Sequence, residues 1–127
     1  MLKSYCKINL FLKVLGKKNN GLHDIQSTTM LLDLHDKISI KKISKNKDEV
    51  FFTGFFKKNI NSKNNTITST LSLLRGHNLI SQNNKYKIVI NKRIPVYAGL
   101  GGGTGNSATI IKYFIKKKNK PKIIRNI

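Results

Sequence analysis

Residues 94–108 read Ile-Pro-Val-Tyr-Ala-Gly-Leu-Gly-Gly-Gly-Thr-Gly-Asn-Ser-Ala, and this stretch decides how the chain is interpreted. It places five glycines directly ahead of an apolar pattern typical of a helix, which continues through Ile110, Ile111 and Phe114. Glycine allows positive φ and lets backbone N–H groups approach an anion, and the helix that follows directs its free N–H groups at the same point. The stretch therefore predicts a phosphate-binding loop, with a flexible glycine linker as the alternative.

The spacing of the glycines excludes two common phosphate-binding motifs. The segment from Gly99 to Thr104 lacks the last glycine of the dinucleotide-binding fingerprint, and no Gly-Lys-Ser/Thr follows, as a Walker loop requires. The stretch from Pro95 to Ala108 instead resembles the Pro-x-x-x-Gly-Leu-Gly-Gly-Gly-Ser-Ser-Asn-Ala-Ala loop of the GHMP kinases, which include galactokinase, homoserine kinase and mevalonate kinase. This resemblance implies an ATP-binding domain.

Two motifs near the amino terminus narrow the resemblance. Residues 6–12 read Cys-Lys-Ile-Asn-Leu-Phe-Leu and residues 21–27 read Gly-Leu-His-Asp-Ile-Gln-Ser. They are similar to the Ala-Lys-Ile-Asn-Leu-x-Leu and Gly-Tyr-His-x-Leu-x-Ser/Thr motifs of the 4-diphosphocytidyl-2-C-methylerythritol kinases, so that the resemblance runs from Ser4 to about Phe114. It implies ATP-dependent and Mg²⁺-dependent phosphorylation of the 2-hydroxyl of this cytidine-diphosphate-linked sugar alcohol, in the non-mevalonate pathway of isoprenoid biosynthesis.

The resemblance also implies which residues hold ATP and the metal ion. The loop amides would bind the phosphates, the Thr104 hydroxyl would face phosphate and Mg²⁺, and Asn65 lies in the segment that the family uses around adenine. A helix N-cap role is the alternative for Thr104, and it accounts for Asn65 equally well. Gly105 and Ser107 depart from the family motif, which has serine and alanine there. The predicted ATP-binding residues are Pro95, Gly99, Leu100, Gly101, Gly102, Gly103, Thr104, Gly105, Asn106 and Asn65, and Thr104 is also the predicted metal ligand.

On the acceptor side, the resemblance assigns three residues of the amino-terminal motifs. Lys7 aligns with the lysine that the family places beside its catalytic base and the acceptor hydroxyl, Asn9 would bind the sugar alcohol, and His23 would recognise the cytosine edge. The alternatives are an exposed strand lysine for Lys7 and a surface turn histidine for His23. Leu22 stands where the family usually has an aromatic residue that stacks on cytosine, which an aliphatic side chain cannot do.

The carboxylate that acts as catalytic base in the family has no counterpart in the chain. It lies in a Gly-Ala-Asp-Val-Pro-like motif beyond the phosphate loop, and no Asp or Glu follows Gly105 here. The acidic residues Asp24, Asp33, Asp36, Asp48 and Glu49 match nothing in that motif and receive no role. We expect residues 1–127 to form one amino-terminal, ATP-binding domain of a GHMP kinase, without the carboxy-terminal domain and with little or no turnover alone.

The order of apolar patterns predicts an α+β fold in two layers, a mostly antiparallel sheet with helices on one face. Strands are expected over residues 3–15, 26–33, 37–43, 50–56 and 85–91, the first four as a meander with a turn at residues 17–21. One helix is expected to begin after Asn65 and to end at a left-handed Gly76, and another to run from about Thr104 to Lys117. Residues 116–127 form a basic tail in which Pro121 disfavours one unbroken helix.

The net charge of +20 favours anionic partners in general. Arginine occurs only at Arg75, Arg93 and Arg125, although Arg is the residue suited to bidentate phosphate and base contacts, so no specific nucleic-acid partner is expected. The small-molecule substrate is the expected partner, and the oligomeric state is left open. The single cysteine, Cys6, and the lack of a long apolar segment favour the cytoplasm, away from membranes. The alternative functions are another GHMP small-molecule kinase and a basic RNA-binding module.

Overall fold

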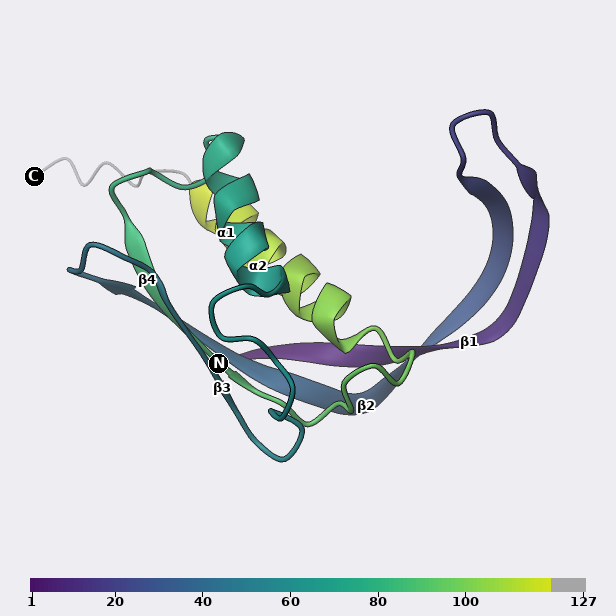
Figure 1. Cartoon of the computed structure of the whole chain (residues 1–127), viewed down its shortest axis with the longest axis horizontal. Coiled ribbons are helices and arrows are strands. Elements are labelled where there is room, and N and C mark those ends of the chain that lie inside the picture. The colour runs from purple at the N-terminus through teal and green to yellow at the C-terminus, as the bar shows by residue number, and fades with distance from the viewer. Residues whose placement is uncertain (120–127) are drawn as a thin grey trace, which may run out of the picture.

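A computed structural model describes residues 1–119 of the chain (Figure 1). The predicted basic tail lies, from residue 120 on, outside the described residues. In chain order the elements are β1 (Leu2–Lys17), β2 (His23–Ile43), β3 (Glu49–Thr53), α1 (Thr66–Gly76), β4 (Lys85–Asn91) and α2 (Gly102–Lys118). Neither helix is long and apolar enough to cross a membrane.

The four strands form one sheet in the order β1-β2-β4-β3. The β1–β2 and β2–β4 pairs are antiparallel, and β3 pairs with β4 in parallel. Both helices lie side by side on one face of the sheet (Figure 1), so the predicted α+β class with a mostly antiparallel sheet is confirmed. The predicted meander is wrong, because β4 inserts between β2 and β3. The chain therefore crosses from β3 through α1 to a parallel neighbour, as parallel pairing requires.

The long β1–β2 hairpin begins in the sheet, extends past the helices, and bends toward the side of the sheet on which they lie (Figure 1). Its turn contains Gly21 at a φ of 82°, as the Asn-Asn-Gly sequence predicts. The two strands predicted over residues 26–33 and 37–43 are one continuous strand, β2. Register shifts in the hairpin, at Tyr5/Lys7 and Asn9/Phe11 among others, bend it without ending the strand.

The core lies between the sheet and the two helices. The alternation predicted for β4 is confirmed, because Tyr86, Ile88 and Ile90 are buried on the face that the helices cover. The ring of Phe114 from α2 meets that of Tyr86 edge to face, with centroids 4.9 Å apart. The other buried members of the core are Ile38, Ile67, Leu71, Leu74, Ile80 and Ile110.

Helix α1 begins as the sequence predicts and ends differently. The Asn65 side chain accepts hydrogen bonds from the amides of Ile67 (2.9 Å) and Thr68 (3.1 Å), which makes Asn65 the N-cap. Gly76 is still helical, and the left-handed residue is Asn78, at a φ of 54°. Asparagine tolerates this conformation better than most residues, so it can reverse the chain where glycine was expected. Helix α2 begins at Gly102, two residues earlier than predicted.

A half-buried ion pair joins α1 to the sheet at the end away from the glycine loop. The Arg75 guanidinium donates to both oxygens of Asp48, at 2.7 and 2.9 Å, and to the Asn84 carbonyl at 2.9 Å. The same carboxylate accepts from the Tyr86 amide at 2.9 Å, where β4 begins. Bidentate geometry and low exposure make this pair stronger than an ordinary surface ion pair.

Asp48→Ala should therefore lower the free energy of unfolding by about 2–3 kcal/mol, because it leaves the Arg75 charge and the Tyr86 amide without their shared acceptor. Urea denaturation followed by circular dichroism measures this. The control is Asp24→Ala, since Asp24 pairs with Lys18 while both side chains are more than half exposed, and its loss should cost less than about 1 kcal/mol. Equal losses in the two variants would contradict the structural role given to Asp48.

Candidate functional site

The glycine loop borders a cavity of about 410 Å³ at the edge of the helical layer. The loop forms one wall, and the segment that leads into α1 forms the other. Lys92, just after β4, lies among the lining residues. The remaining lining residues are Phe52, Asn59, Ile60, Asn61, Asn64, Asn65, Thr66, Ile67, Pro95, Val96, Tyr97, Ala98, Gly99, Leu100, Gly101, Gly102, Gly103, Thr104 and Asn106. The structure thus brings most of the predicted ATP-binding residues to one cavity.

The start of α2 leaves backbone donors free toward this cavity. Its N-cap, Gly101, has a φ of 69° and supplies no side-chain hydrogen bond, and the first turn holds no acidic residue. The N-cap role considered for Thr104 is therefore wrong. The first amides of a helix have no partner inside the helix, so those of Gly102, Gly103 and Thr104 are available to an anion. The glycine turn and the helix start together make an anion-binding arrangement.

The loop glycines serve different purposes. Gly99 and Gly101 take positive φ values of 72° and 69°, which L side chains rarely adopt. Gly102 has no positive φ, but a Cβ placed there would lie 3.2 Å from Ile94 Cγ2 and 3.3 Å from Lys92 Nζ. Glycine is therefore needed at position 102 for space above these buried side chains, and at positions 99 and 101 for backbone conformation.

A buried carboxylate beneath the loop fixes where it starts. Asp36, on β2, is fully buried, and its Oδ1 accepts from the backbone amides of Arg93 (2.7 Å) and Ile94 (2.9 Å). Its Oδ2 forms an ion pair with Lys92 Nζ and accepts from Asn106 Nδ2 at 3.0 Å. The carboxylate thereby joins β2, the segment after β4 and α2. Four donors surround it, so both the charge and the lone pairs of Asp36 are satisfied inside the protein.

Lys7 lies beside the loop. Its amide donates to the Leu100 carbonyl at 3.1 Å, which ties β1 to the loop. Its side-chain carbons Cε and Cγ pass 3.2 and 3.3 Å from the position of a Cβ on Gly101, so the aliphatic stem crosses this glycine. The residue itself is exposed. The structure therefore places the ammonium group of Lys7 near the mouth of the glycine loop and accessible from solvent.

Three of the predicted ATP-side residues have mainly structural contacts. Asn106 is buried and uses its amide nitrogen on Asp36. Asn65 uses its side-chain oxygen as the α1 N-cap and both amide hydrogens on the carbonyls of Asn61 and Ser62, so it shapes the cavity wall without a spare donor. Gly105 does not line the cavity; a Cβ there would lie 3.1 Å from Ser4 Oγ, because α2 approaches β1 closely at this point. A side chain at position 105 would therefore need a small shift of Ser4.

The predicted substrate-side residues lie along the hairpin. Asn9 is exposed on β1, two residues beyond Lys7, and pairs in register with Thr29. His23 is exposed at the start of β2, next to the hairpin turn, at the end of the hairpin that extends past the helices (Figure 1). The described residues do not bring His23 to the loop cavity. Its assignment to cytosine stays a prediction.

Sequence reasoning missed several residues that build the site. Asp36 and Lys92 were overlooked because they lie outside the three motifs that carry the resemblance, although an acidic residue inside an apolar strand of a chain this basic is a usable signal. Gly54, at a φ of 88°, lets the chain after β3 pass so closely that a Cβ would lie 2.6 Å from the Lys92 carbonyl. Tyr97 has a φ of 60° and an 89% exposed side chain at the cavity rim. Such a backbone conformation is uncommon for tyrosine and often marks a functional loop.

A mixed sheet of this order, with two helices on one face and an uncapped glycine-rich helix start, defines the class of protein: an α+β domain with an anion-binding loop. A crystal structure of 4-(cytidine 5'-diphospho)-2C-methyl-D-erythritol kinase has the same fold, with a TM-score of 0.65 at 23% identity. The match covers 91% of this chain and 40% of that one.

Relatives found by sequence carry the name of the same kinase. The chain is 45% identical over 117 residues to the 4-diphosphocytidyl-2-C-methyl-D-erythritol kinase of Pelagibacter ubique, covering 92% of this chain and 41% of that protein. The kinase of the same name from Thermosipho melanesiensis is 34% identical over 122 residues, with coverage of 96% and 42%. No family model matches the chain. Over nine-tenths of its length the chain is therefore homologous to these kinases, which confirms the resemblance of its motifs, and it spans about two-fifths of their length.

Asp36→Asn should lower the free energy of unfolding by about 3–5 kcal/mol, because it leaves the buried Lys92 ammonium without a counter-charge. Chemical denaturation measures the loss, and Asp36→Asn combined with Lys92→Met should recover part of it. Asp33→Asn is the control, since the Asp33 side chain is 97% exposed, and it should change stability by less than about 0.5 kcal/mol. A stable Asp36→Asn variant with an unchanged loop would show that the carboxylate is dispensable.

Proposed function

We propose that the chain supplies the ATP-binding part of a kinase that phosphorylates 4-diphosphocytidyl-2-C-methyl-D-erythritol. The observation that carries the proposal is the uncapped start of α2, which follows two glycines in the left-handed conformation and opens into the loop cavity. The names of the relatives support this substrate. A protein with this composition and a buried, free Cys6 is compatible with the reducing cytoplasm that we propose for it.

The loop would bind the triphosphate of ATP through backbone groups. In phosphoryl transfer a protein mainly positions the reactants and neutralises the charge that spreads over the transferred group. The amides of Gly102 and Gly103 would donate to phosphate oxygens, and the positive end of the α2 dipole would add to the attraction. The exposed ring of Tyr97 stands at the rim, where it is available to cover the nucleobase.

The chain offers little to a divalent cation. Within residues 1–119, no three His, Cys, Asp or Glu side chains cluster to hold a metal ion. Asp36 is the carboxylate beneath the loop, but four donors already engage it. Mg²⁺ would neutralise phosphate charge when bound, and the exposed hydroxyl of Thr104 is the group that would reach it from this chain. Most of its ligands would have to be phosphate oxygens and water.

On the acceptor side, Lys7 would attract the hydroxyl that receives the phosphoryl group. A fixed ammonium beside a hydroxyl favours loss of its proton, and the Lys7 stem is held against Gly101 so that the charge stays near the phosphates. No carboxylate follows Gly105 in the sequence, so the general base would have to come from the part of the relatives that has no counterpart here. The complete reaction therefore needs that part.

Gly102→Val should weaken binding of a non-hydrolysable ATP analogue at least about 10-fold, because its side chain displaces Ile94 and Lys92 and moves the helix start from the phosphates. Isothermal titration calorimetry measures the affinity. Gly16→Val is the matched control, since a Cβ at Gly16 meets nothing within 4 Å, and it should bind normally. Normal binding by Gly102→Val, or no binding by the unmodified chain, would refute the assignment of the loop.

Lys7 is tested in a hybrid kinase, in which this chain replaces the matching 117 residues of the Pelagibacter ubique relative. Lys7→Ala should keep the affinity for the ATP analogue within about threefold and lower kcat by about 100-fold, the usual range for a lost proton-transfer group. A coupled assay of ADP release with the cytidine substrate gives kcat, and Lys13→Ala, on the exposed part of β1, is the control. If Lys7→Ala lost the nucleotide but kept kcat, the roles of lysine and loop would be exchanged.

A further inference from the structure

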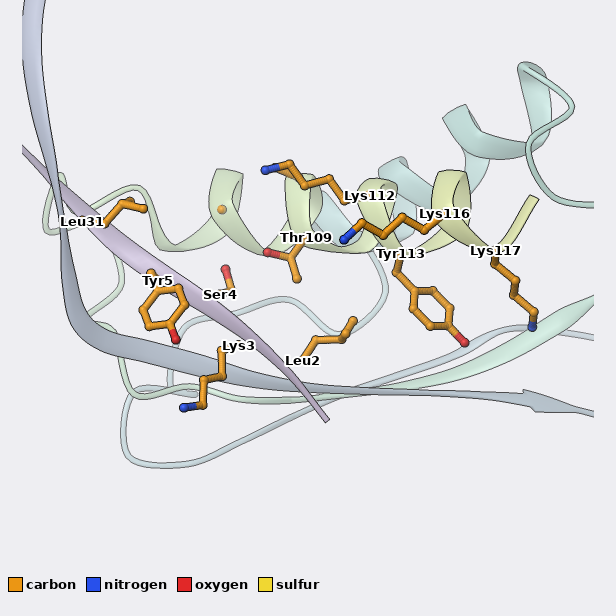
Figure 2. Close-up of a pocket in the computed structure, with 12 residues that line it drawn as sticks. Leu2, Lys3, Ser4, Tyr5, Leu31, Thr109, Lys112, Tyr113, Lys116 and Lys117 are labelled. Carbon is orange, nitrogen blue, oxygen red and sulfur yellow. The ribbon is translucent and has the colours of Figure 1, made fainter. Parts of the chain in front are cut away.

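A second, larger groove lies on the other side of α2, between this helix and β1 (Figure 2). Its volume is about 720 Å³, and it is separate from the loop cavity, with which it shares no lining residue. The lining residues are Leu2, Lys3, Ser4, Tyr5, Leu31, Gly105, Ala108, Thr109, Lys112, Tyr113, Lys116 and Lys117. Nothing in the proposed binding of ATP or substrate uses this groove.

The chemistry of the groove is apolar inside and basic around it. Leu2, Leu31 and Tyr113 give it apolar surface, and Leu31 is 68% exposed there. Lysines stand on both sides, Lys3 on β1 and Lys112 and Lys116 on α2, and the lining contains no acidic residue (Figure 2). An occupant must therefore combine apolar and acidic groups. A second copy of this chain, with its own charge of +20, does not meet that requirement.

The groove also contains unpartnered polar groups. Ser4 is buried, yet its hydroxyl has no hydrogen-bond partner, and Figure 2 shows it directed toward α2.

The groove also borders the edge of the sheet. β1 is an edge strand, and within residues 1–119 its only backbone hydrogen bond outside the β1–β2 pairing runs from Lys7 to Leu100. Alternate backbone groups between Leu2 and Tyr5 thus have no hydrogen-bond partner among the described residues. Proteins rarely leave such an edge uncovered beside an apolar surface.

We infer that this groove is the docking surface for an acidic, extended polypeptide segment that adds to the β1 edge. Edge addition provides backbone hydrogen bonds, while the apolar floor and the lysines select the side chains. On the proposed function, the segment belongs to the part of the kinase relatives that residues 1–127 do not match, some three-fifths of their length. RNA, the competing anionic occupant, has no peptide backbone that could pair with β1.

Hydrogen exchange on the hybrid kinase tests the inference. The β1 amides between Leu2 and Tyr5 that face away from β2 should exchange at least about 10-fold more slowly in the hybrid than in the isolated chain, because the added segment protects them. Lys112→Glu combined with Lys116→Glu should remove this protection. The matched control, Lys41→Glu with Lys42→Glu, carries the same charge change on exposed β2 residues outside the groove and should keep it.

Leu31→Asp, at an exposed position of the groove, should also remove the protection of the β1 amides. It serves as the test variant if the helix variant loses its fold. Unprotected β1 amides in a catalytically active hybrid would overturn the docking inference while the proposed function stands. Protected amides in an inactive hybrid would support the docking and count against the proposed function. Equal loss in the groove and control variants, or protection of the isolated chain by poly-uridine at physiological salt, would show general attraction to anions and overturn the inference.

Discussion

The buried carboxylate of Asp36 is the interaction on which the geometry of the site depends. Its charge is balanced by Lys92, and it also accepts from two backbone amides at the start of the glycine-loop segment and from Asn106 on α2. A buried charge is tolerated only when it is paired and fully hydrogen-bonded, so these partners are held in a single arrangement. Because they come from β2, the segment after β4, and α2, the carboxylate sets the distance between the sheet and the start of α2.

The loop gains its phosphate-binding character from that constraint. Lys92 and Ile94 lie so close to Gly102 that a side chain there would have to displace them, and the Lys7 stem approaches Gly101 from the β1 side. A glycine turn held in this way keeps its amides directed at the cavity before any ligand arrives, which reduces the ordering cost of binding. Interactions that stabilise the fold and interactions that shape the site are therefore the same at this end of the molecule, whereas the Asp48–Arg75 pair acts at the other end of α1.

Local patterns were predictable from sequence, and long-range contacts were not. The alternation of Tyr86, Ile88 and Ile90 and the cap at Asn65 depend on neighbours within a few residues, so the sequence indicates them directly. The insertion of β4 between β2 and β3 depends on which strands find each other across the fold, and a list of strands does not contain that information. Asp36 was missed for the same reason, since its partners are 56 to 70 positions away.

The family motif predicted where the loop lies, but not which contacts each of its residues makes. Gly105 looked like a lost hydroxyl in a phosphate site, whereas the structure places it outside the loop cavity, where a Cβ would lie 3.1 Å from Ser4 Oγ. Asn106, predicted to bind ATP, lines the cavity and donates its side-chain amide to Asp36. A motif records which residues occur together, and only the three-dimensional arrangement separates those that face the cavity from those that hold the helix in place.

The most direct test of this account is the response of individual backbone amides to nucleotide. In a ¹⁵N-correlated NMR titration of the chain with a non-hydrolysable ATP analogue, the largest shifts should fall on the amides of Gly101, Gly102, Gly103 and Thr104, at the uncapped start of α2. Smaller shifts should follow around the cavity wall at Asn64 and Tyr97. Saturable binding that leaves the four loop amides unmoved, with shifts on the lysines of α2 or β2 instead, would contradict the phosphate site.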